Sequence, residues 1–487
     1  MILAAAFPLL AALGTGQEPA AAAAPQVLHV SGRGGSDAEG DGTAAAPYRS
    51  LTRALRAAAG SGPLELRVDV GTYSAASGEE FPLRLANGTQ LLGLAPQVCR
   101  IEAGGAAAVL DLAGGAGRTV LADLTLTGAE TGVQVSGWTA GELVLRDVRC
   151  ERLGTGLAWE GGSADRGSAR LRVAGARFRA CSSAGVRATG VIDLQLSDAR
   201  FENCGVGLEI PAIPLDESGR PLVGLRVEGC VFADSAGAGV RIAGLAGPVA
   251  GGRPFAFAGC EFRACDVGLQ IERPAGDHPL ELRGCRFSDN LRFGLALVGA
   301  NGDPAARSLI EDCRFTGNGV GLHLVNTQLQ LEVRNCRILE SQGNGVFFGN
   351  FLAEPSLGVF VGNLIAGNGA AGLYALSDGR NLRVIAEACT VAGNAASGIQ
   401  RREKHGGTSG FDLRGCIVAG NGEDLVLIGA DEVHDCWIGV GTHAGENGNR
   451  GGDAAFVDAA AGDYRLRADS PCRLSGAAVP GAFKDSE

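Results

Sequence analysis

One feature constrains the fold of this chain more than any other: a short phrase that recurs along most of its length. In each copy an apolar or aromatic residue is followed six or seven positions later by glycine and a second aliphatic residue, as in Phe262, Gly268 and Leu269. Successive copies lie about 23 to 31 residues apart, a spacing that is typical of stacked repeats. The repeat therefore predicts a solenoid.

The coils of this solenoid are predicted to be strands. Around each copy apolar and polar residues alternate, as in residues 225–232, 280–287, 331–338 and 411–418. A period of two indicates a β-strand, not a helix. Leucine-rich repeats share this period but need a helix or a fixed asparagine motif in each unit, and the repeats here are too rich in glycine for that. A parallel β-helix, in which equivalent side chains stack about 4.8 Å apart, fits the pattern better.

Two inward ladders can be read from the repeats. Two residues before the phenylalanine, most copies carry cysteine, with alanine or asparagine in the others: Ala176, Ala199, Cys230, Cys260, Cys285, Cys313, Cys336, Asn363, Cys389 and Cys416. Three residues after the phenylalanine, several copies carry asparagine: Asn290, Asn318, Asn368, Asn394 and Asn421. Asparagine tolerates left-handed backbone and can hydrogen-bond to its copies above and below. We therefore predict a structural amide ladder at a corner of the coil.

Composition agrees with an elongated, exported repeat protein. A solenoid grows by adding coils, so 487 residues with 78 glycines are expected to form one elongated domain. The net charge of −11 argues against nucleic acid as the main partner. The 14 cysteines contain no Cys-x-x-Cys pair, so we interpret them as small buried hydrophobes and not as metal ligands. Stacked neighbours would lie within disulfide range, which leaves bridging in an oxidising compartment open.

The two ends of the chain differ from the repeats. Residues 1–25 combine an apolar stretch with small residues and are interpreted as a signal peptide and linker, too short to span a membrane. Residues 27–59 then predict a strand, an Asp/Gly loop and a helix with Ser50 as N-cap and an apolar stripe through Leu51 and Leu55. This helix is expected to cover the first coil.

These ends carry a family resemblance. The strand, Gly-Ser-Asp loop, Pro47-Tyr48 and capping helix resemble the opening of pectin-lyase-like right-handed parallel β-helix proteins, and residues 68–93 resemble a bacterial family of unknown function with this opening. Residues 454–483 are similar to the closing segment of such exported proteins, except for an altered turn at residues 472–476. The resemblance implies an all-β, single-stranded, right-handed parallel β-helix with an N-terminal capping helix. It covers nearly the whole chain but does not specify a function.

We accordingly divide the chain into four parts. Residues 1–25 are the signal peptide and linker, 26–100 the N-terminal cap and first coils, 101–440 the parallel β-helix repeats, and 441–487 a C-terminal β-tail. The repeats and the cap together predict about thirteen coils.

Irregular insertions mark one edge of the predicted solenoid. They follow the Gly-aliphatic strand at residues 158–168, 211–221, 243–253, 272–279, 299–307, 349–356, 400–410 and 428–435. Insertions on one face of a repeat protein often form its binding surface. We expect the substrate-binding residues on this edge to be Asp378, Arg380, Asp431, Glu432 and His434.

The basic run within residues 400–410 is the candidate catalytic site. It contains Arg401, Arg402, Lys404 and His405, with acidic residues expected one coil away. Lyases with this fold resemble that arrangement: a lysine or arginine removes the proton next to a uronate carboxylate, and a cation neutralises the enolate. The alternative interpretation is a solvated loop. A hydrolase would need two carboxylates about 5 Å or up to about 9.5 Å apart, and no pair stands out from the sequence.

Two further charged patterns have a functional and a structural interpretation. Asp37, Glu39 and Asp41 could bind Ca²⁺ through oxygens, or form a turn before the capping helix. Outward positions between the ladders carry an arginine stripe that could hold an acidic glycan, or pair with glutamates expected on the same faces. The stripe consists of Arg149, Arg177, Arg200, Arg286, Arg314 and Arg337, and the glutamates are Glu228, Glu281, Glu311 and Glu332.

The sequence thus predicts a monomeric protein, secreted or periplasmic, that binds or processes an extracellular polysaccharide of neutral or acidic character. A uronate-type lyase is preferred to a hydrolase if the protein is an enzyme. The alternative is a non-catalytic cell-surface, adhesion or structural solenoid. Few aromatic residues are expected at the loop edge, with Trp159, Phe351 and Tyr374 the nearest. No cofactor other than Ca²⁺ is predicted, and no membrane span.

Overall fold

The computed structural model describes most of the chain. It covers residues 24–59, 62–115, 117–138, 140–161, 169–190, 192–212, 223–243, 255–272, 279–299, 307–327, 330–352, 355–378, 382–403, 409–428, 431–441 and 443–474. The predicted signal peptide therefore lies almost entirely outside the described residues.

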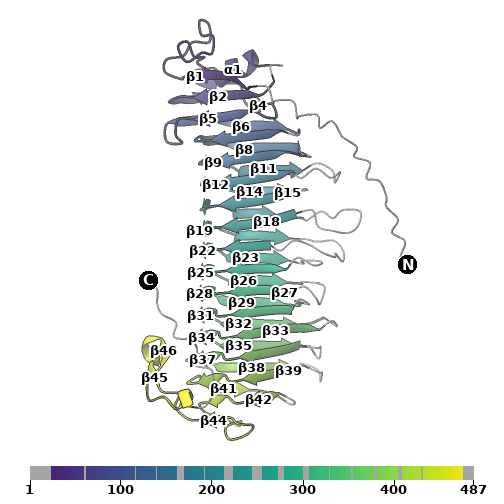
Figure 1. The fold of residues 1–487 in the computed structure, drawn as a ribbon, viewed down its shortest axis with the longest axis vertical. Coiled ribbons are helices and arrows are strands. Elements are labelled where there is room, and N and C mark those ends of the chain that lie inside the picture. The colour runs from purple at the N-terminus through teal and green to yellow at the C-terminus, as the bar shows by residue number, and fades with distance from the viewer. Residues whose placement is uncertain are drawn as a thin grey trace, which may run out of the picture.

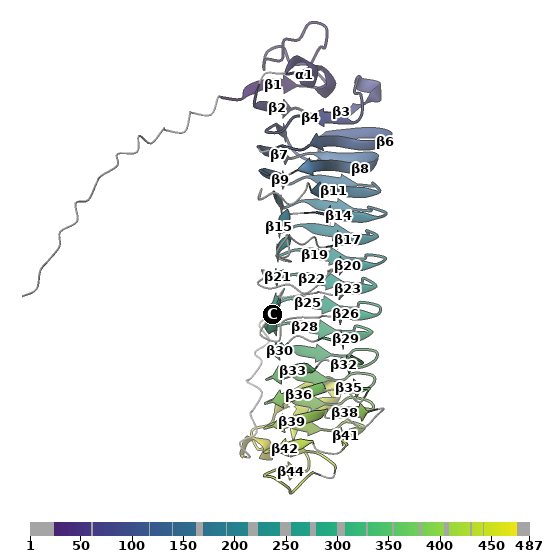
Figure 2. The ribbon, with the colours of Figure 1, turned by 90° about the vertical axis from the view of Figure 1, so that its right-hand side faces the viewer.

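The molecule is a long stack of coils with the N-terminal helix at one end (Figures 1 and 2). Each coil contributes strands to three parallel faces, which we call sheets 1, 2 and 3. Sheet 1 contains sixteen parallel strands in chain order. They are β1 (Gln26–Val30), β2 (Leu64–Val68), β5 (Gln90–Gly93), β7 (Arg118–Ala122), β9 (Glu142–Arg146), β12 (Arg170–Ala174), β15 (Ile192–Ser197), β18 (Val223–Glu228), β21 (Phe255–Ala258), β24 (Leu280–Arg283), β27 (Arg307–Glu311), β30 (Gln330–Arg334), β33 (Ser356–Val361), β36 (Leu382–Glu387), β39 (Gly410–Arg414) and β42 (Glu432–His434).

Sheet 2 is built mainly from the short strands that carry the phenylalanine of each repeat. They are β10 (Arg149–Glu151), β13 (Arg177–Arg179), β16 (Arg200–Glu202), β19 (Val231–Ala233), β22 (Glu261–Arg263), β25 (Arg286–Ser288), β28 (Arg314–Thr316), β31 (Arg337–Leu339), β34 (Leu364–Ala366), β37 (Thr390–Ala392), β40 (Ile417–Ala419), β43 (Trp437–Ile438) and β44 (Arg450–Gly451).

Sheet 3 contains the Gly-aliphatic strands. They are β11 (Thr155–Gly161), β14 (Ala184–Thr189), β17 (Val206–Ile210), β20 (Ala238–Ala243), β23 (Val267–Glu272), β26 (Phe293–Val298), β29 (Val320–Val325), β32 (Val346–Asn350), β35 (Leu373–Ser377), β38 (Ser397–Glu403) and β41 (Glu423–Val426). In the first coils the long strands β6 (Cys99–Ala113) and β8 (Thr125–Trp138) run through both sheets, after β3 (Gly71–Ser74) and β4 (Leu83–Leu85).

Single residues in left-handed conformation turn the chain between the sheets. Asp123 (φ 59°) and Asp147 (φ 52°) lie between sheets 1 and 2, and Ala180 (φ 54°) lies between sheets 2 and 3. Asparagine, aspartate and glycine tolerate this conformation best, which explains much of the glycine content. Because these corners are short, differences in length between coils fall mainly on the connection from sheet 3 back to sheet 1.

The predicted ladders are confirmed inside the stack. Phenylalanines of adjacent coils stack face to face, with ring centroids 4.6 Å apart for Phe262 and Phe287 and again for Phe287 and Phe315. The asparagines are hydrogen-bonded to one another on both sides of Ser341, with Asn290 Nδ2 donating to Asn318 Oδ1 and Asn368 Nδ2 to Asn394 Oδ1, each at 2.8 Å. All 14 cysteines are buried and free.

Close backbone approach explains the glycine that opens each Gly-aliphatic pair. A Cβ atom on Gly268 would lie 2.5 Å from the carbonyl oxygen of Gly294 on the next coil. Gly294 faces Gly321 in the same way, at 2.8 Å. Because backbone cannot move aside as a side chain can, glycine is required at this point of the coil.

Helix α1 (Leu51–Ala57) lies over the first coil, and the C-terminal tail packs on the side of the last coils. The helix begins after Ser50, whose hydroxyl accepts a hydrogen bond from the Arg53 N–H, as predicted. At the other end, β45 (Phe456–Asp458) and β46 (Asp463–Leu466) form a hairpin that turns back along the stack (Figure 1). Short 3₁₀ helices occur at Ala75–Ser77, Ala459–Ala461 and Pro471–Leu474.

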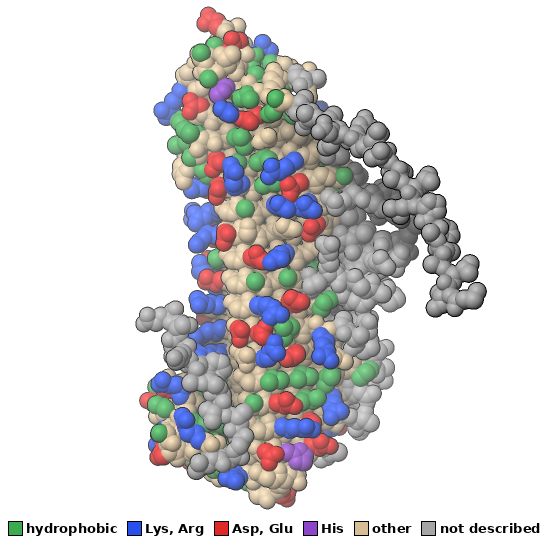
Figure 3. Space-filling view, viewed as in Figure 1, with side chains coloured by type: hydrophobic (Ala, Val, Ile, Leu, Met, Phe, Trp, Pro, Cys, Tyr) green, Lys and Arg blue, Asp and Glu red, His purple; other side chains and the backbone are tan. Residues whose placement is uncertain are grey.

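The outer surface of sheet 1 is a mosaic of opposite charges. Arg283 and Arg334, on either side of Glu311, both pair with its carboxylate, and Arg118 pairs with Glu142 at 2.9 Å. Figure 3 shows Lys/Arg and Asp/Glu side chains interleaved over the face toward the viewer. Ion pairs between exposed partners of this kind add little stability but satisfy the charges of the sheet.

Candidate functional site

A row of aromatic rings runs along the outer surface of sheet 3. The residues two positions after the glycine on successive coils are His323, Phe347 and Tyr374, which are in direct register. The ring of Phe293 joins the row because the residue of its strand that is in register with His323 is the small Ala296. Ring centroids are 4.2 Å apart for Phe293 and His323, 5.1 Å for His323 and Phe347, and 5.7 Å for Phe347 and Tyr374. All four rings are half-buried.

The two ends of this aromatic row differ. At one end the guanidinium of Arg292 lies 5.6 Å from the centroid of Phe293, and Asp266 holds that guanidinium by hydrogen bonds of 2.8 and 2.9 Å. At the other end the next residue in the column is Gln400. Among the described residues, Tyr374 therefore has a ring partner on one side only, and its plane is tilted by 38° from that of Phe347.

Polar groups surround the open end of the row. The side-chain oxygen of Gln400 accepts a hydrogen bond from Ser397 at 3.3 Å, which leaves the amide nitrogen to donate outward. Arg402 lies two residues further along β38, in register with Leu376, and its side chain is exposed. An aromatic ring, an amide donor and a guanidinium thus lie on one surface around Tyr374, which we call the Tyr374 subsite (Tyr374, Leu376, Gln400, Arg402).

The surroundings of the histidine in the row favour its neutral form. Burial in the stack lowers the pKa of His323, and the nearby charge of Arg292 lowers it further. A neutral imidazole packs against Phe293 and Phe347 without the cost of burying a charge.

Arg401 lies inside the solenoid instead of lining the edge. It follows Ile271, Leu297, Leu324, Phe348 and Ala375 in an inward column and is 4% exposed. Its guanidinium donates to Asp431 at 2.6 Å, to Glu403 at 2.9 Å and to the Ile428 carbonyl at 2.8 Å. The Asp431 carboxylate also accepts the N–H groups of Phe411 and Ile428. These contacts give Arg401 and Asp431 a structural role, because they join β38 to the start of the last strand of sheet 1.

The other predicted binding residues separate onto different surfaces. Glu432 and His434 belong to strand β42 and lie in the outward columns of sheet 1, not in a loop. Asp378 directly follows β35 and is half-buried, with its N–H donating to the Asn350 carbonyl at 3.2 Å. Lys404, His405 and Arg380 lie outside the described residues. The structure therefore places Arg402, but not Glu432 or His434, beside the aromatic row.

The carboxylates of the N-terminal loop are occupied with turn and helix contacts. Asp37 accepts hydrogen bonds from the N–H groups of Arg49 and Ser50 and from the Ser50 hydroxyl, at 2.8, 2.9 and 2.7 Å. Asp41 accepts from the Thr43 N–H at 2.9 Å, and these bonds to Thr43 lower its pKa. Within the described part of the chain, no three His, Cys, Asp or Glu side chains are grouped as metal ligands. Ca²⁺ binding by Asp37, Glu39 and Asp41 stays a prediction.

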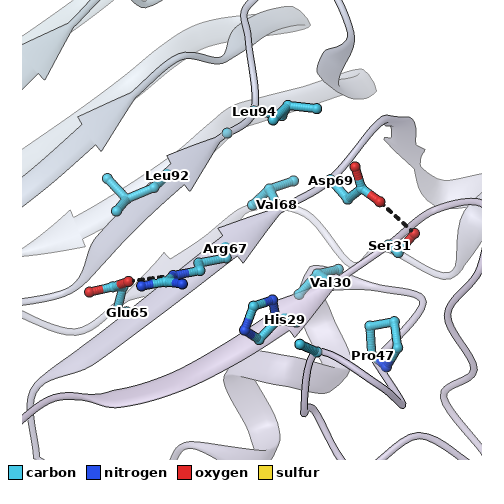
Figure 4. A pocket seen from close by; sticks show the side chains of 12 residues that line it. His29, Val30, Ser31, Pro47, Glu65, Arg67, Val68, Asp69, Leu92 and Leu94 are labelled. Carbon is cyan, nitrogen blue, oxygen red and sulfur yellow. Dashed lines mark hydrogen bonds and ion pairs between the residues drawn. The ribbon is translucent and has the colours of Figure 1, made fainter.

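A pocket of about 490 Å³ opens on the outer side of sheet 1 at its N-terminal end (Figure 4). Its labelled side chains come from β1, β2 and β5 and from the loop before α1. Arg67 lies 2.7 Å from Glu65, and the Ser31 hydroxyl donates to Asp69 at 3.3 Å. Because these polar groups are paired with one another, they are less available to a ligand than those of the Tyr374 subsite.

The aromatic row was not predicted, although the sequence contains a signal for it. Alignment of the repeats on their glycine places His323, Phe347 and Tyr374 at one outward position. Trp159, which was expected near the loop edge, is instead 1% exposed and packs against Trp138, with 5.7 Å between ring centroids. In the described part of the chain, no helix is long and apolar enough to cross a membrane.

The three parallel sheets and their stacked ladders define the class: this is a right-handed parallel β-helix protein. Residues 33–126 match the model of a family described as a protein of unknown function, DUF1565. This match confirms the predicted N-terminal resemblance. No curated protein matches the chain.

Several solved structures are similar to the chain in fold. The A-module of the mannuronan C-5 epimerase AlgE6 from Azotobacter vinelandii is 16% identical, with a TM-score of 0.34, over 83% of this chain and 94% of that one. A GH87 alpha-1,3-glucanase from Streptomyces thermodiastaticus is 14% identical, with a TM-score of 0.37, over 84% and 70%. Tailspike protein 3 of bacteriophage CBA120 is 13% identical, with a TM-score of 0.43, over 80% and 59%.

Proposed function

We propose that this protein is exported and binds an extracellular polysaccharide along the outer surface of sheet 3, with the Tyr374 subsite as its anchoring point. The observation that carries the proposal is the end of the aromatic row at Tyr374, where Gln400 takes the next position in the column and Arg402 lies on the same surface. An aromatic face attracts the weakly positive C–H groups of a sugar ring, because the ring quadrupole is negative on its face. Gln400 and Arg402 supply donors for sugar hydroxyl or carboxylate oxygens beside that face.

The shape of the molecule supports an extended ligand. The aromatic row spans the strands β26, β29, β32 and β35 and runs along the long axis of the stack (Figure 2). A chain of sugars could therefore follow the row beyond the subsite, making apolar contacts with the ring edges of Phe347 and His323. Such a binding surface serves an enzyme and a non-catalytic surface module equally well.

Lyase chemistry is the finer form of the proposal. Arg402 is exposed on the same strand face as Gln400, and the sequence continues to Lys404 and His405 within two and three residues. In this form Arg402 would neutralise a uronate carboxylate, and Lys404 would remove the proton on the neighbouring carbon. Elimination across the glycosidic bond would then leave an unsaturated sugar at the new non-reducing end.

A polysaccharide panel tests both levels of the proposal. Binding of the mature protein to neutral and anionic polysaccharides would be measured by affinity electrophoresis, while ultraviolet absorbance and reducing ends report products. Tyr374→Ala should weaken binding about tenfold or more, as expected when an anchoring aromatic is truncated, and Tyr374→Phe should retain most of it. The proposal fails if Tyr374→Ala and Arg402→Gln bind every bound polysaccharide as the parent does. The lyase form alone fails if no unsaturated product appears.

A further inference from the structure

A column of arginines lies on the outer surface of sheet 2, away from the Tyr374 subsite. It contains two sets of three: Arg149, Arg177 and Arg200 on consecutive coils, and Arg286, Arg314 and Arg337 on consecutive coils. Val231 and Glu261 occupy the two positions between the sets. At about 4.8 Å per coil the column extends for about 34 Å. Figure 3 shows Lys and Arg side chains following the left-hand edge of the molecule, where Figure 1 labels β19 to β31.

The structure bears on the ion-pairing interpretation of this stripe for most of its arginines. Glu228, Glu281, Glu311 and Glu332, which were expected to neutralise it, belong to strands of sheet 1. Among the described residues, no carboxylate lies within 4.0 Å of the guanidinium groups of Arg149, Arg200, Arg286 or Arg314. Arg177 alone in the first set has an ion pair, at 3.7 Å to Glu202. Ion pairing, which explains the arginines of sheet 1, therefore does not explain these four arginines of sheet 2.

A column of like charges in which Arg149, Arg200, Arg286 and Arg314 have no carboxylate partner among the described residues carries a cost. Like charges directly opposite each other on neighbouring strands destabilise a sheet, and such a pairing occurs twice in each set of three arginines. Further along the column, Leu364, Thr390, Ile417 and Trp437 replace arginine before Arg450 follows, and the C-terminal tail packs on Ile417 and Trp437. Places where a sequence breaks a local rule without a compensating contact are expected to be functional.

A concave surface accompanies the first set. A cleft of about 390 Å³ is lined by Arg149, Arg177 and Arg200 on one side and by the corner residues Asp123, Asp147 and Asp198, with Pro96 and Gln97, on the other. Of these carboxylates, Asp123 pairs with Arg146 at 3.6 Å. The cleft thus offers guanidinium donors and carboxylate acceptors side by side.

We propose that this arginine column is a second polysaccharide-binding face, selective for acidic chains. It deepens the proposed function and rests on it for the class of polymer. The guanidinium groups would bind the carboxylate or sulfate groups of the chain, and Asp147 and Asp198 would accept hydrogen bonds from its hydroxyls. This combination disfavours nucleic acid, because the corner carboxylates and the net charge of −11 repel a dense row of phosphates.

Two cellulose ethers that share a backbone provide the test. Binding of the full-length protein to carboxymethyl cellulose and to hydroxyethyl cellulose would be compared over a range of salt concentrations. The variant R149Q/R177Q/R200Q should bind carboxymethyl cellulose at least about tenfold more weakly and with a shallower salt dependence. The control R118Q/R172Q/R226Q removes the same charge from sheet 1, where each arginine has a carboxylate partner at 2.9, 3.0 or 2.6 Å, and should bind as the parent does.

The outcomes separate this inference from the proposed function. Equal binding of carboxymethyl cellulose by the two triple variants would overturn the inference, whatever Tyr374→Ala does. So would binding of poly-L-glutamate without binding of carboxymethyl cellulose, since the column would then take a carboxylate polymer that is not a sugar. Loss of hydroxyethyl cellulose binding in Tyr374→Ala, with normal binding in R149Q/R177Q/R200Q, supports the Tyr374 subsite alone. Failure of Tyr374→Ala to affect either polymer counts against the subsite and leaves the arginine column standing.

Discussion

At the scale of single residues, the asparagine ladder is expected to be a main source of order in the C-terminal coils. Asn394 is 1% exposed and bonds to both neighbouring coils. Its amide nitrogen donates to Asn421 at 2.8 Å and to the Ile365 carbonyl at 3.2 Å, and its oxygen accepts from Asn368 at 2.8 Å. Buried polar groups left without a partner cost about 1 to 3 kcal/mol each.

Asn394→Ala should therefore lower the free energy of unfolding by about 3 kcal/mol or more, since several of these partners lose their bond. Urea denaturation followed by circular dichroism measures this. Asn203→Ala is the matched control: Asn203 is an exposed corner residue with φ 53°, and alanine occupies the equivalent corner at Ala180 and Ala264. Equal losses in the two variants would show that the ladder bonds add nothing beyond the corner geometry.

The adjacent residues Arg401 and Arg402 should respond in opposite ways to substitution. Arg401→Met removes one partner of a buried ion pair and leaves Asp431, whose side chain is 1% exposed, without its cation. A loss of about 3 to 5 kcal/mol in unfolding free energy is expected. Arg402→Gln changes an exposed side chain and should alter stability by about 0.5 kcal/mol or less.

Denaturation curves combined with polysaccharide binding distinguish the two roles. Arg402→Gln should weaken binding while its unfolding midpoint stays unchanged. If Arg401→Met unfolds at the same denaturant concentration as the parent, the structural role assigned to Arg401 is wrong.

At the scale of elements, the period-two alternation predicted the strands, the repeat predicted the inward ladders, and the Ser50 N-cap with its apolar stripe predicted the capping helix. Inward residues are easy to predict because each one stacks on the equivalent residue of the next coil. The bounds of the insertions were less predictable. Residues 400–410 were expected to form a loop, but β38 continues to Glu403. Because side chains alternate in direction along this extension of the strand, Arg401 points inward and Arg402 points outward. The basic run is therefore divided between the core and the surface.

The aromatic row was missed for a related reason. The neighbours of an outward residue depend on the register between strands of adjacent coils. That register depends on the corners of the coils and not on local strand propensity. Phe293, for example, is aligned with Val320 and joins the row only because Ala296 leaves room for its ring. Alignment of the repeats on their glycine could have found the other three rings, but the place of Phe293 needs the three-dimensional stack.

His323 should make this row sensitive to pH. Burial and Arg292 lower its pKa in the folded protein from the ordinary value of about 6.5. The unfolded chain therefore binds the proton first as pH falls, so stability declines below about pH 6.5 and continues to decline until the folded-state pKa is reached. Above that range the histidine contributes no pH dependence.

His323→Phe removes this contribution while keeping a ring in the stack. We expect the fall in melting temperature between neutral and mildly acidic pH to be smaller in the variant than in the parent, as measured by thermal denaturation at a series of pH values. His434→Phe, at an outward position of β42, is the control and should keep the parent's pH dependence. An identical pH profile for His323→Phe and the parent would contradict the assignment.

At the scale of the whole molecule, the C-terminal tail protects a surface that the coils alone would expose. Ile417 and Trp437 lie on the outer side of sheet 2, and they form a separate cluster with Leu466 and Cys472 of the tail. The Trp437 indole N–H also donates to the Gly452 carbonyl at 2.9 Å. An uncovered apolar patch at the end of a stack invites association, which is why terminal repeats of solenoids are capped.

Leu466→Asp should release the tail from the coils, because it places a charge in this cluster, where Leu466 is 5% exposed. Thiol labelling offers a direct readout, since all 14 cysteines are buried and Cys472 alone lies in the tail. Burial raises the pKa of Cys472 to about 11, so the docked thiol should be unreactive near neutral pH.

In Leu466→Asp one cysteine per chain should react, and peptide mapping should identify it as Cys472. Val457→Asp makes the same kind of change at a residue that is 48% exposed and should leave every thiol protected. Labelling of the stacked cysteines in Leu466→Asp would instead mean that the tail supports the whole solenoid, and that the coils and the tail unfold together.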